Sequence, residues 1–131
     1  MTTHFGEAWL TMGVSFGLHV VDEATHDFLA WYNPAARRIS TFLGGLPFPP
    51  TFTFLPWLIG LLVATAILVG LTPFAFRGAP WLRTVAVVVG VINSGNGLFH
   101  LVAAVVLRRL VPGVISAPLL LASAVWLLWE A

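Results

Sequence analysis

Two histidines and two acidic residues lie close together in one otherwise apolar stretch of the chain: His19, Asp22, Glu23 and His26. On an α-helix they occupy positions i, i+3, i+4 and i+7, so all four side chains share one face over about two turns. Lipid or an apolar core cannot solvate such a face. We therefore expect it to contact polar protein groups, water, a metal ion or a substrate.

A second polar cluster lies much further along the chain, in the segment from Asn93 to His100. Asn93, Asn96, Gly97 and His100 repeat the same i, i+3, i+4, i+7 spacing, so they also share one helical face. No other segment of the chain offers a comparable set of partners for the first cluster. The sequence therefore predicts that the two faces meet.

One chemistry that these residues allow is a metal centre. Glu23 and His26 have the Glu-x-x-His spacing of carboxylate metal sites in helical bundles. Three imidazoles and one carboxylate suit one divalent metal, zinc or non-haem iron. The predicted ligands are His19, Glu23, His26 and His100. Asp22 and Asn96 would orient the ligand nitrogens.

The competing chemistry needs no metal or other cofactor. A carboxyl group beside a histidine in a dry cavity can give and take protons on an apolar substrate, as isomerisation or cyclisation requires. The candidate catalytic residues are His19, Asp22, Glu23, Asn96 and His100. A third interpretation assigns the cluster to helix packing, or to binding or transport of a proton, an ion or a small molecule. Several ionisable groups on one face are costly for packing alone.

The composition of the whole chain predicts an integral membrane protein. Of its 131 residues, 59% are hydrophobic and only 8% are charged, whereas a soluble domain carries about 25% charged residues.

The net charge of +1 gives no clustered basic face for nucleic acid, so no nucleic-acid partner is expected. The absence of cysteine excludes disulfides and thiolate ligands. The expected partners are membrane lipid or a hydrophobic small-molecule substrate, and the sequence leaves the oligomeric state open.

Four apolar runs predict a single all-α domain over residues 1–131, folded as a four-helix transmembrane bundle. The expected helices are 7–32, 52–71, 80–108 and 114–129. Pro34 is expected to end the first helix, and residues 34–50 to form a connection at the membrane surface. Pro118 is expected in the first turn of the last helix.

The positions of the arginines and of the polar clusters predict orientation and depth. Four of the six arginines lie at or after the ends of the first and third helices: Arg37, Arg38, Arg108 and Arg109. The positive-inside rule then places both termini outside the cytoplasm. Glu23 and Asn96 lie at similar distances from the ends of their helices, so both polar faces should lie at one depth. We expect His19 or Glu23 within about 4 Å of His100 or Asn96.

The residues Leu18-His19-Val20-Val21-Asp22-Glu23, taken with Asn96-Gly97-Leu98-Phe99-His100-Leu101, resemble the HXXEE family of small bacterial and archaeal membrane proteins. The stretch 108–117, with Pro112-Gly113 before small and apolar residues, is also similar to that family. Asp22 stands where the family usually has Glu, which leaves Glu23 as the safer functional carboxylate, and His26 is not part of the signature. The resemblance implies a membrane-embedded enzyme, expected in the bacterial cytoplasmic membrane.

Overall fold

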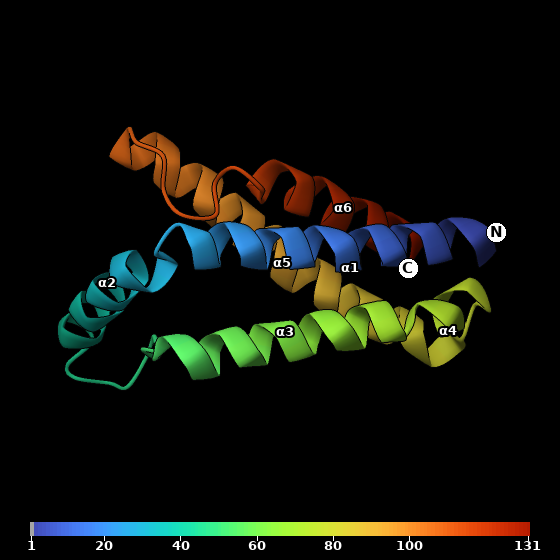
Figure 1. Ribbon diagram of the computed structural model, residues 1–131, viewed down its shortest axis with the longest axis horizontal. Coiled ribbons are helices and arrows are strands. Elements are labelled where there is room, and N and C mark those ends of the chain that lie inside the picture. Colours follow the sequence, from blue (N-terminus) through green and yellow to red (C-terminus); the bar gives the residue numbers. More distant parts are fainter. Residues whose placement is uncertain (1) are drawn as a thin grey trace.

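The computed structural model describes residues 2–131, with side chains from His4 onward. The elements in this range are all helical: α1 (Thr2–Thr25), α2 (Phe28–Phe42), α3 (Phe54–Gly70), α4 (Thr72–Phe76), α5 (Pro80–Leu107) and α6 (Ala117–Glu130). Figure 1 shows α1 along the middle of an elongated bundle, with α3 beside it and α5 crossing behind it at a slant. The two termini lie at the same end, and α2 bends away at the other.

The central helix is α1, which packs against α6 on one side and against α3 and α4 on the other. The most extensive helix–helix packing is between α5 and α6. Glycines permit this approach: a Cβ added at Gly90 would lie 2.6 Å from Leu128 Cγ, and one added at Gly97 would lie 3.1 Å from the Ala117 carbonyl oxygen. Small residues allow two helix backbones to come together in this way.

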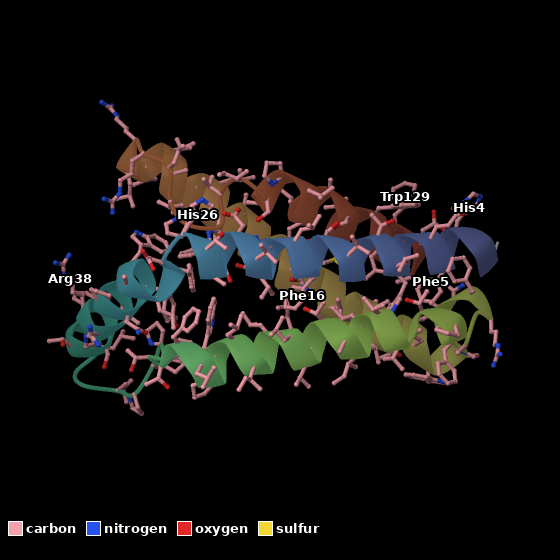
Figure 2. The ribbon with its side chains drawn as sticks, viewed as in Figure 1. His4, Phe5, Phe16, His26, Arg38 and Trp129 are labelled. Atoms are coloured by element: carbon pink, nitrogen blue, oxygen red, sulfur yellow. The ribbon has the colours of Figure 1, made fainter. Side chains whose placement is uncertain are left out.

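The buried apolar residues gather where α1 begins, in a region that we call the apolar end. Phe5, Trp9 and Met12 of α1 are at most 1% exposed and pack with side chains of α4, α5 and α6. The further members of this cluster are Ala8, Ala75, Leu82, Ala86, Leu120, Ala124 and Leu127. Figure 2 shows Phe5 at this end and His26 toward the opposite end of α1. The polar residues singled out above therefore lie outside the main apolar core.

Within residues 2–131, two helical segments are long and apolar enough to cross a membrane, Phe54–Phe76 and Pro80–Leu107. Length and composition alone do not separate such a segment from the core helix of a soluble protein. In the first segment, however, none of the most apolar window is buried inside the protein. Leu55 and Ile67, for example, are 62% and 55% exposed. Many apolar side chains of α3 therefore face the surroundings of the protein.

The prediction of one helix over residues 7–32 is wrong. α1 ends at Thr25, Asp27 adopts a left-handed backbone conformation with φ 55°, and α2 begins at Phe28. Pro34 does not end a helix but lies inside α2, which continues to Phe42. Proline removes one backbone hydrogen bond, and the carbonyl left without it belongs to Ala30, an exposed residue that water or lipid head groups can reach.

The predicted connection over residues 34–50 is correspondingly too early and too long. Residues 34–42 are helical, and the connection between α2 and α3 covers residues 43–53. Asn33 holds the two helices together across it: its Nδ2 donates to the Phe52 carbonyl at 2.8 Å, and the Phe52 N–H donates to Asn33 Oδ1 at 3.0 Å. Tyr32 adds a bond from its hydroxyl to the Pro50 carbonyl at 2.9 Å.

The other predicted helices are close to the observed ones. The last helix begins three residues later than predicted, because Gly113 has a left-handed φ of 87° and residues 113–116 form turns before α6. Pro118 does lie in the first turn of that helix, as predicted. This late start has a consequence for the site, because it leaves Ser116 in a turn rather than in a helix.

Candidate functional site

The two predicted polar faces meet inside the bundle. His100 Nε2 lies 3.0 Å from Glu23 Oε1, and His19 Nε2 lies 3.3 Å from the same oxygen. The side chains of His19, Glu23 and His100 are only 1%, 7% and 0% exposed. The predicted contact between the first helix and His100 is therefore confirmed, with one carboxylate oxygen at its centre.

The helices explain why these three side chains converge. His19 and Glu23 are four residues apart on α1, so they are neighbours on one face. His100 comes from α5, two turns before that helix ends. The two imidazole rings meet edge to face, with ring centroids 4.8 Å apart. Each ring thereby restricts the orientation of the other.

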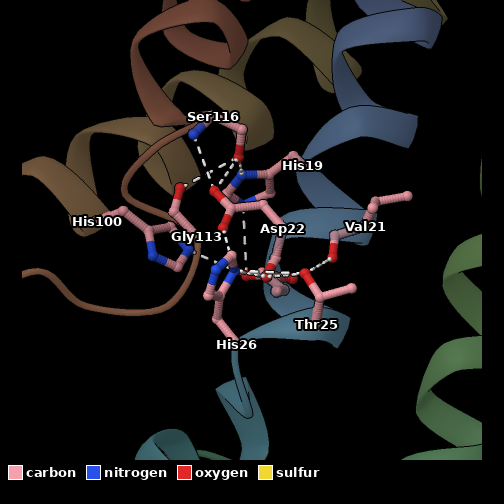
Figure 3. Close-up of polar contacts among 9 residues, drawn as sticks. His19, Val21, Asp22, Thr25, His26, His100, Gly113 and Ser116 are labelled. Atoms are coloured by element: carbon pink, nitrogen blue, oxygen red, sulfur yellow. Dashed lines mark hydrogen bonds and ion pairs between the residues drawn. The ribbon is translucent and has the colours of Figure 1, made fainter.

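Ser116, which the sequence did not single out, connects Asp22 to His19. Its backbone N–H and its hydroxyl both donate to Asp22 Oδ2, at 2.9 and 2.7 Å. His19 Nδ1 lies 2.7 Å from the same hydroxyl oxygen. Figure 3 shows Ser116 beside the two side chains, with dashed lines for its polar contacts. The other acceptor near the hydroxyl, the Gly113 carbonyl, is farther away at 3.2 Å.

These bonds favour one tautomer of a neutral His19 imidazole. A hydroxyl has a single proton to donate, and Ser116 gives it to the Asp22 carboxylate. The hydroxyl oxygen must then accept a hydrogen bond from His19 Nδ1–H. In a neutral imidazole the other nitrogen, Nε2, consequently carries a lone pair, and it is this nitrogen that faces Glu23.

The centre of the site therefore requires a proton or a cation. His19 Nε2 makes no hydrogen bond among the residues that the structure describes, although it lies 3.3 Å from Glu23 Oε1. A buried lone pair facing a carboxylate oxygen is unfavourable unless something positive lies between them. One ligand atom from each of His19, Glu23 and His100 lies within 4.8 Å of the others, so this group could hold a metal ion.

Aromatic rings and a glycine enclose His100. The ring centroids of Phe28, Trp31 and Phe99 lie 5.6, 6.4 and 5.4 Å from the centroid of its imidazole. On another side, a Cβ added at Gly113 would lie only 2.6 Å from His100 Cε1. The segment between α5 and α6 thus passes directly against the imidazole. The first turns of α2, which the sequence analysis assigned to the end of the first helix, supply Phe28 and Trp31.

His26, a predicted metal ligand, lies apart from the His19–Glu23–His100 group. Its side chain is 54% exposed and its Nδ1 pairs with Asp22 Oδ1 at 2.9 Å (Figure 3). The reason is that α1 ends at Thr25, so the next residue no longer continues the helical face. Asp22 therefore separates His26 from the two buried histidines.

Asn96, a predicted catalytic residue, points elsewhere. It is half-buried and lines a cavity of about 480 Å³ among apolar side chains of α1, α3 and α5. In the described part of the chain its side chain forms no hydrogen bond with His19, Glu23 or His100. Because α5 crosses α1 at a slant (Figure 1), a residue one turn before His100 is already displaced from the polar face of α1.

Ser116 and Gly113 were missed because nothing in helical periodicity points to them. Ser116 contacts residues more than 90 positions earlier in the chain, and both residues lie in turns. A signal was nevertheless present in the resemblance of the stretch 108–117 to the family pattern, which contains both residues. Its Pro-Gly pair and its small residues mark a segment that packs closely against a neighbour.

Fold and site together define an all-helical protein whose buried polar group combines residues of α1, α5 and the turn before α6. A family model described as "Protein of unknown function with HXXEE motif" matches residues 9–127. The chain belongs to the HXXEE family. No curated protein and no solved structure matches the chain significantly. The motif residues His19, Asp22 and Glu23 belong to the buried polar group. Its two acids have different partners: Asp22 is bonded to Ser116, and Glu23 faces the two histidines.

Proposed function

We propose that this chain is a small integral membrane enzyme that acts on a lipid-soluble substrate at His19, Glu23 and His100. The observation that carries the proposal is the convergence of two imidazole nitrogens on one buried carboxylate oxygen, at 3.0 and 3.3 Å. Ionisable groups in the membrane interior are costly and mark functional sites by default. The surrounding apolar helices suit a substrate that arrives from the lipid phase.

The shape of the bundle supports four membrane spans, α1, α3, α5 and α6. At about 1.5 Å per residue, α1 is about 36 Å long and α5 about 42 Å, against a hydrocarbon core of about 30 Å. α6 is only 14 residues long. It begins close to His100, however, because the chain folds back into the bundle through Gly113 before the helix starts. Both termini lie at the same end (Figure 1), as an even number of spans requires.

Membrane orientation can be tested with single cysteines, because the natural chain contains none. The arginine distribution places α2 and the turn after α5 on the cytoplasmic side. A membrane-impermeant maleimide should therefore label Ala131→Cys from outside intact cells but not Thr41→Cys. The opposite labelling pattern would overturn this orientation.

The donor set supports a single zinc or iron ion. Two histidines and one glutamate are a known catalytic zinc set with one coordination position open, and two histidines with one carboxylate also suit non-haem iron. Tetrahedral ligands at about 2.0–2.1 Å from zinc lie about 3.3 Å from one another. The two distances to Glu23 Oε1 are 3.0 and 3.3 Å, and all three ligand atoms lie within 4.8 Å of one another. The bond from His19 Nδ1–H to Ser116 is of the kind that orients metal-binding histidines. When bound, the ion would polarise a substrate oxygen or activate water.

One observation also favours a second candidate, a metal-free acid–base enzyme. His100 Nε2 and Glu23 Oε1 are already at hydrogen-bonding distance, 3.0 Å, so a shared proton can replace the cation. In this case Glu23 and His100 would move a proton on the apolar substrate, as an isomerase or a cyclase does. Both candidates use the same residues, and the metal content of the protein separates them.

The test is elemental analysis of gently purified protein, combined with incubation in a membrane lipid extract that is then analysed by mass spectrometry. The metal hypothesis expects about one zinc or iron per chain in the wild type and almost none in Glu23→Gln or His100→Leu. His4→Leu is the matched control, because His4 is exposed and its polar partner among residues 4–131 is its neighbour Glu7.

A wild type without metal whose lipid products disappear in Glu23→Gln would support the acid–base candidate. If the wild type holds no metal and its lipid products equal those of Glu23→Gln, the enzyme proposal is wrong. The polar group would then serve packing or transport.

A further inference from the structure

Two adjoining cavities lie where α1 turns into α2. Their volumes are about 630 and 460 Å³. Both are lined by His26 and Asp27 from the turn and by residues 110–112 from the segment after α5. They share these five lining residues, and we call the pair the hinge cleft. Figure 2 shows His26 at this turn, with Arg38 further along α2.

The larger cavity of the hinge cleft carries an excess of positive charge. Arg38 of α2 and Arg109, which follows α5, both line it. Among residues 4–131, neither arginine forms an ion pair with an acidic side chain, even though Asp27 lines the same cavity. Two guanidinium groups against one carboxylate leave room for an additional anion. Guanidinium groups bind phosphate and carboxylate oxygens through paired hydrogen bonds.

The remaining walls of the larger cavity are largely apolar. Trp31, Leu107 and Leu110 line it beside the two arginines. An inorganic anion gains little from an indole ring and leucine side chains. A molecule with an anionic group on a hydrocarbon body matches both kinds of wall.

The hinge cleft also adjoins the buried polar group. Trp31 lines the larger cavity, and its ring centroid is 6.4 Å from that of His100. Asp22 lines the smaller cavity and is joined through Ser116 to His19. A group held in the cleft would thus lie one side chain away from the proposed catalytic residues.

We propose that the hinge cleft binds the phosphate head group of the lipid-soluble substrate, with Arg38 and Arg109 as its ligands. This inference rests on the proposed function, because it takes the occupant of the cleft to be the substrate of the site. It specifies the substrate class as a phosphorylated lipid. The phosphate lies at the membrane interface, and the adjoining carbons lie toward His100.

The binding of dihexanoyl phosphatidic acid to the purified protein in mild detergent tests the proposal, with isothermal titration calorimetry as the readout. Arg38→Gln and Arg109→Gln should each raise the Kd about tenfold or more, because hydrogen bonds to charged groups are the strong ones. Arg37→Gln is the matched control: Arg37 is the adjacent residue of α2 but lines a different cavity, with Ser40 and Pro47. Its Kd should stay within about twofold of wild type. Asp27→Asn should lower the Kd by removing a repelling charge.

Two further ligands identify the source of the phosphate. Dihexanoyl phosphatidylcholine tests the need for a free anionic head group, and inorganic phosphate tests the need for the hydrocarbon. Phosphatidic acid should bind more tightly than either. Equal affinity for inorganic phosphate would overturn the lipid part of the proposal. An equal loss of affinity in Arg37→Gln and Arg38→Gln would overturn the site, because binding would then reflect diffuse charge alone.

The variant Glu23→Gln separates this proposal from the proposed function. Its carboxamide lies outside the hinge cleft, so its affinity for phosphatidic acid should equal that of wild type. If wild type and Glu23→Gln bind phosphatidic acid equally and no chemistry is found at Glu23, the head-group site stands and the enzyme assignment fails. If metal or turnover depends on Glu23 but Arg38→Gln leaves the Kd unchanged, the enzyme assignment stands and the hinge cleft proposal fails.

Discussion

The two ends of the bundle differ in what their buried side chains require. At the apolar end, Phe5 and Trp9 are enclosed by other apolar side chains, and the indole N–H of Trp9 donates to the Leu68 carbonyl at 2.7 Å. At the other end, His19 Nε2 and His100 Nδ1 are buried without a hydrogen-bond partner among the described residues. Buried polar atoms without partners cost stability. The comparison indicates that the apolar end holds the fold together, and it is consistent with our proposal that the polar end serves chemistry.

The largest effect on stability is expected from a core substitution at the apolar end. Leu120 of α6 is fully buried in the apolar cluster. Leu120→Ala should lower the free energy of unfolding by about 2–5 kcal/mol because it leaves a cavity. Leu119→Ala is the control, since Leu119 is 47% exposed and its truncation leaves no internal cavity. Denaturation in mild detergent measures both, and equal losses would contradict the proposed role of the apolar end.

A smaller effect on stability, but a large one on the site, is expected from Gly113→Ala. The new Cβ would lie 2.6 Å from His100 Cε1, so the imidazole or the turn must shift, and we expect the bond between His100 and Glu23 to be disturbed. Overpacking of this kind costs about 1–3 kcal/mol. Gly44→Ala is the control: Gly44 has a left-handed φ of +78°, similar to the +87° of Gly113, but a Cβ added at Gly44 would have no atom within 4 Å. Only the variant at 113 should lose bound metal or activity, and an equal loss in both would disprove the role of this close contact.

Removing the hydroxyl that orients His19 should weaken the site while the fold is retained. Ser116→Ala leaves His19 Nδ1 without its 2.7 Å partner. Loss of such an outer contact typically lowers metal affinity about 10–100-fold. Ser123→Ala is the matched control, because the Ser123 hydroxyl is buried but donates to backbone carbonyls of its own helix. Metal titration measures the difference, and similar affinities in the two variants would show that the hydroxyl at 116 does not orient His19.

The smallest effect is expected from His26→Gln. This side chain is 54% exposed and pairs with Asp22 rather than with Glu23. The variant should therefore retain about one metal ion per chain and near-wild-type stability, within about 0.5 kcal/mol. Metal analysis checks this directly. Complete loss of the ion would restore His26 to the ligand set that its sequence spacing first suggested.

Much of the fold and the centre of the site could be predicted from the sequence because both depend on helical periodicity. The four-residue spacing of His19 and Glu23 places them on one face, and the predicted contact of this face with His100 is confirmed. The depth argument for that contact assumed a helix end at residue 32, whereas α1 ends at Thr25. The turn at Asp27 could not be predicted in the same way. Its left-handed backbone has no glycine to mark it, and the proline at position 34 gave a stronger but misleading signal.

The rest of the site depends on distances that periodicity does not contain. Asn96 shares a helical face with His100, but the slant of α5 across α1 decides that only His100 reaches Glu23. Ser116 and Gly113 reach the site through turns, and contacts made by turns between distant segments are not encoded in any local pattern. The end of α1 at Thr25 likewise determines, through the fold, that His26 leaves the face.

The central claim, that the polar end is functional and does not hold the fold together, is tested most directly by one measurement of unfolding. The variant with leucine replacing His19, Glu23 and His100 together removes the three side chains that meet at Glu23 Oε1 and keeps similar side-chain volumes. Asp22 stays bonded to the Ser116 backbone N–H and hydroxyl. Replacing a buried polar group as a whole by apolar residues is often neutral or stabilising by about 1–4 kcal/mol. We therefore predict an unfolding free energy equal to or above that of wild type, with loss of metal or activity. A loss of stability as large as that of Leu120→Ala would contradict the claim and assign the group to helix packing.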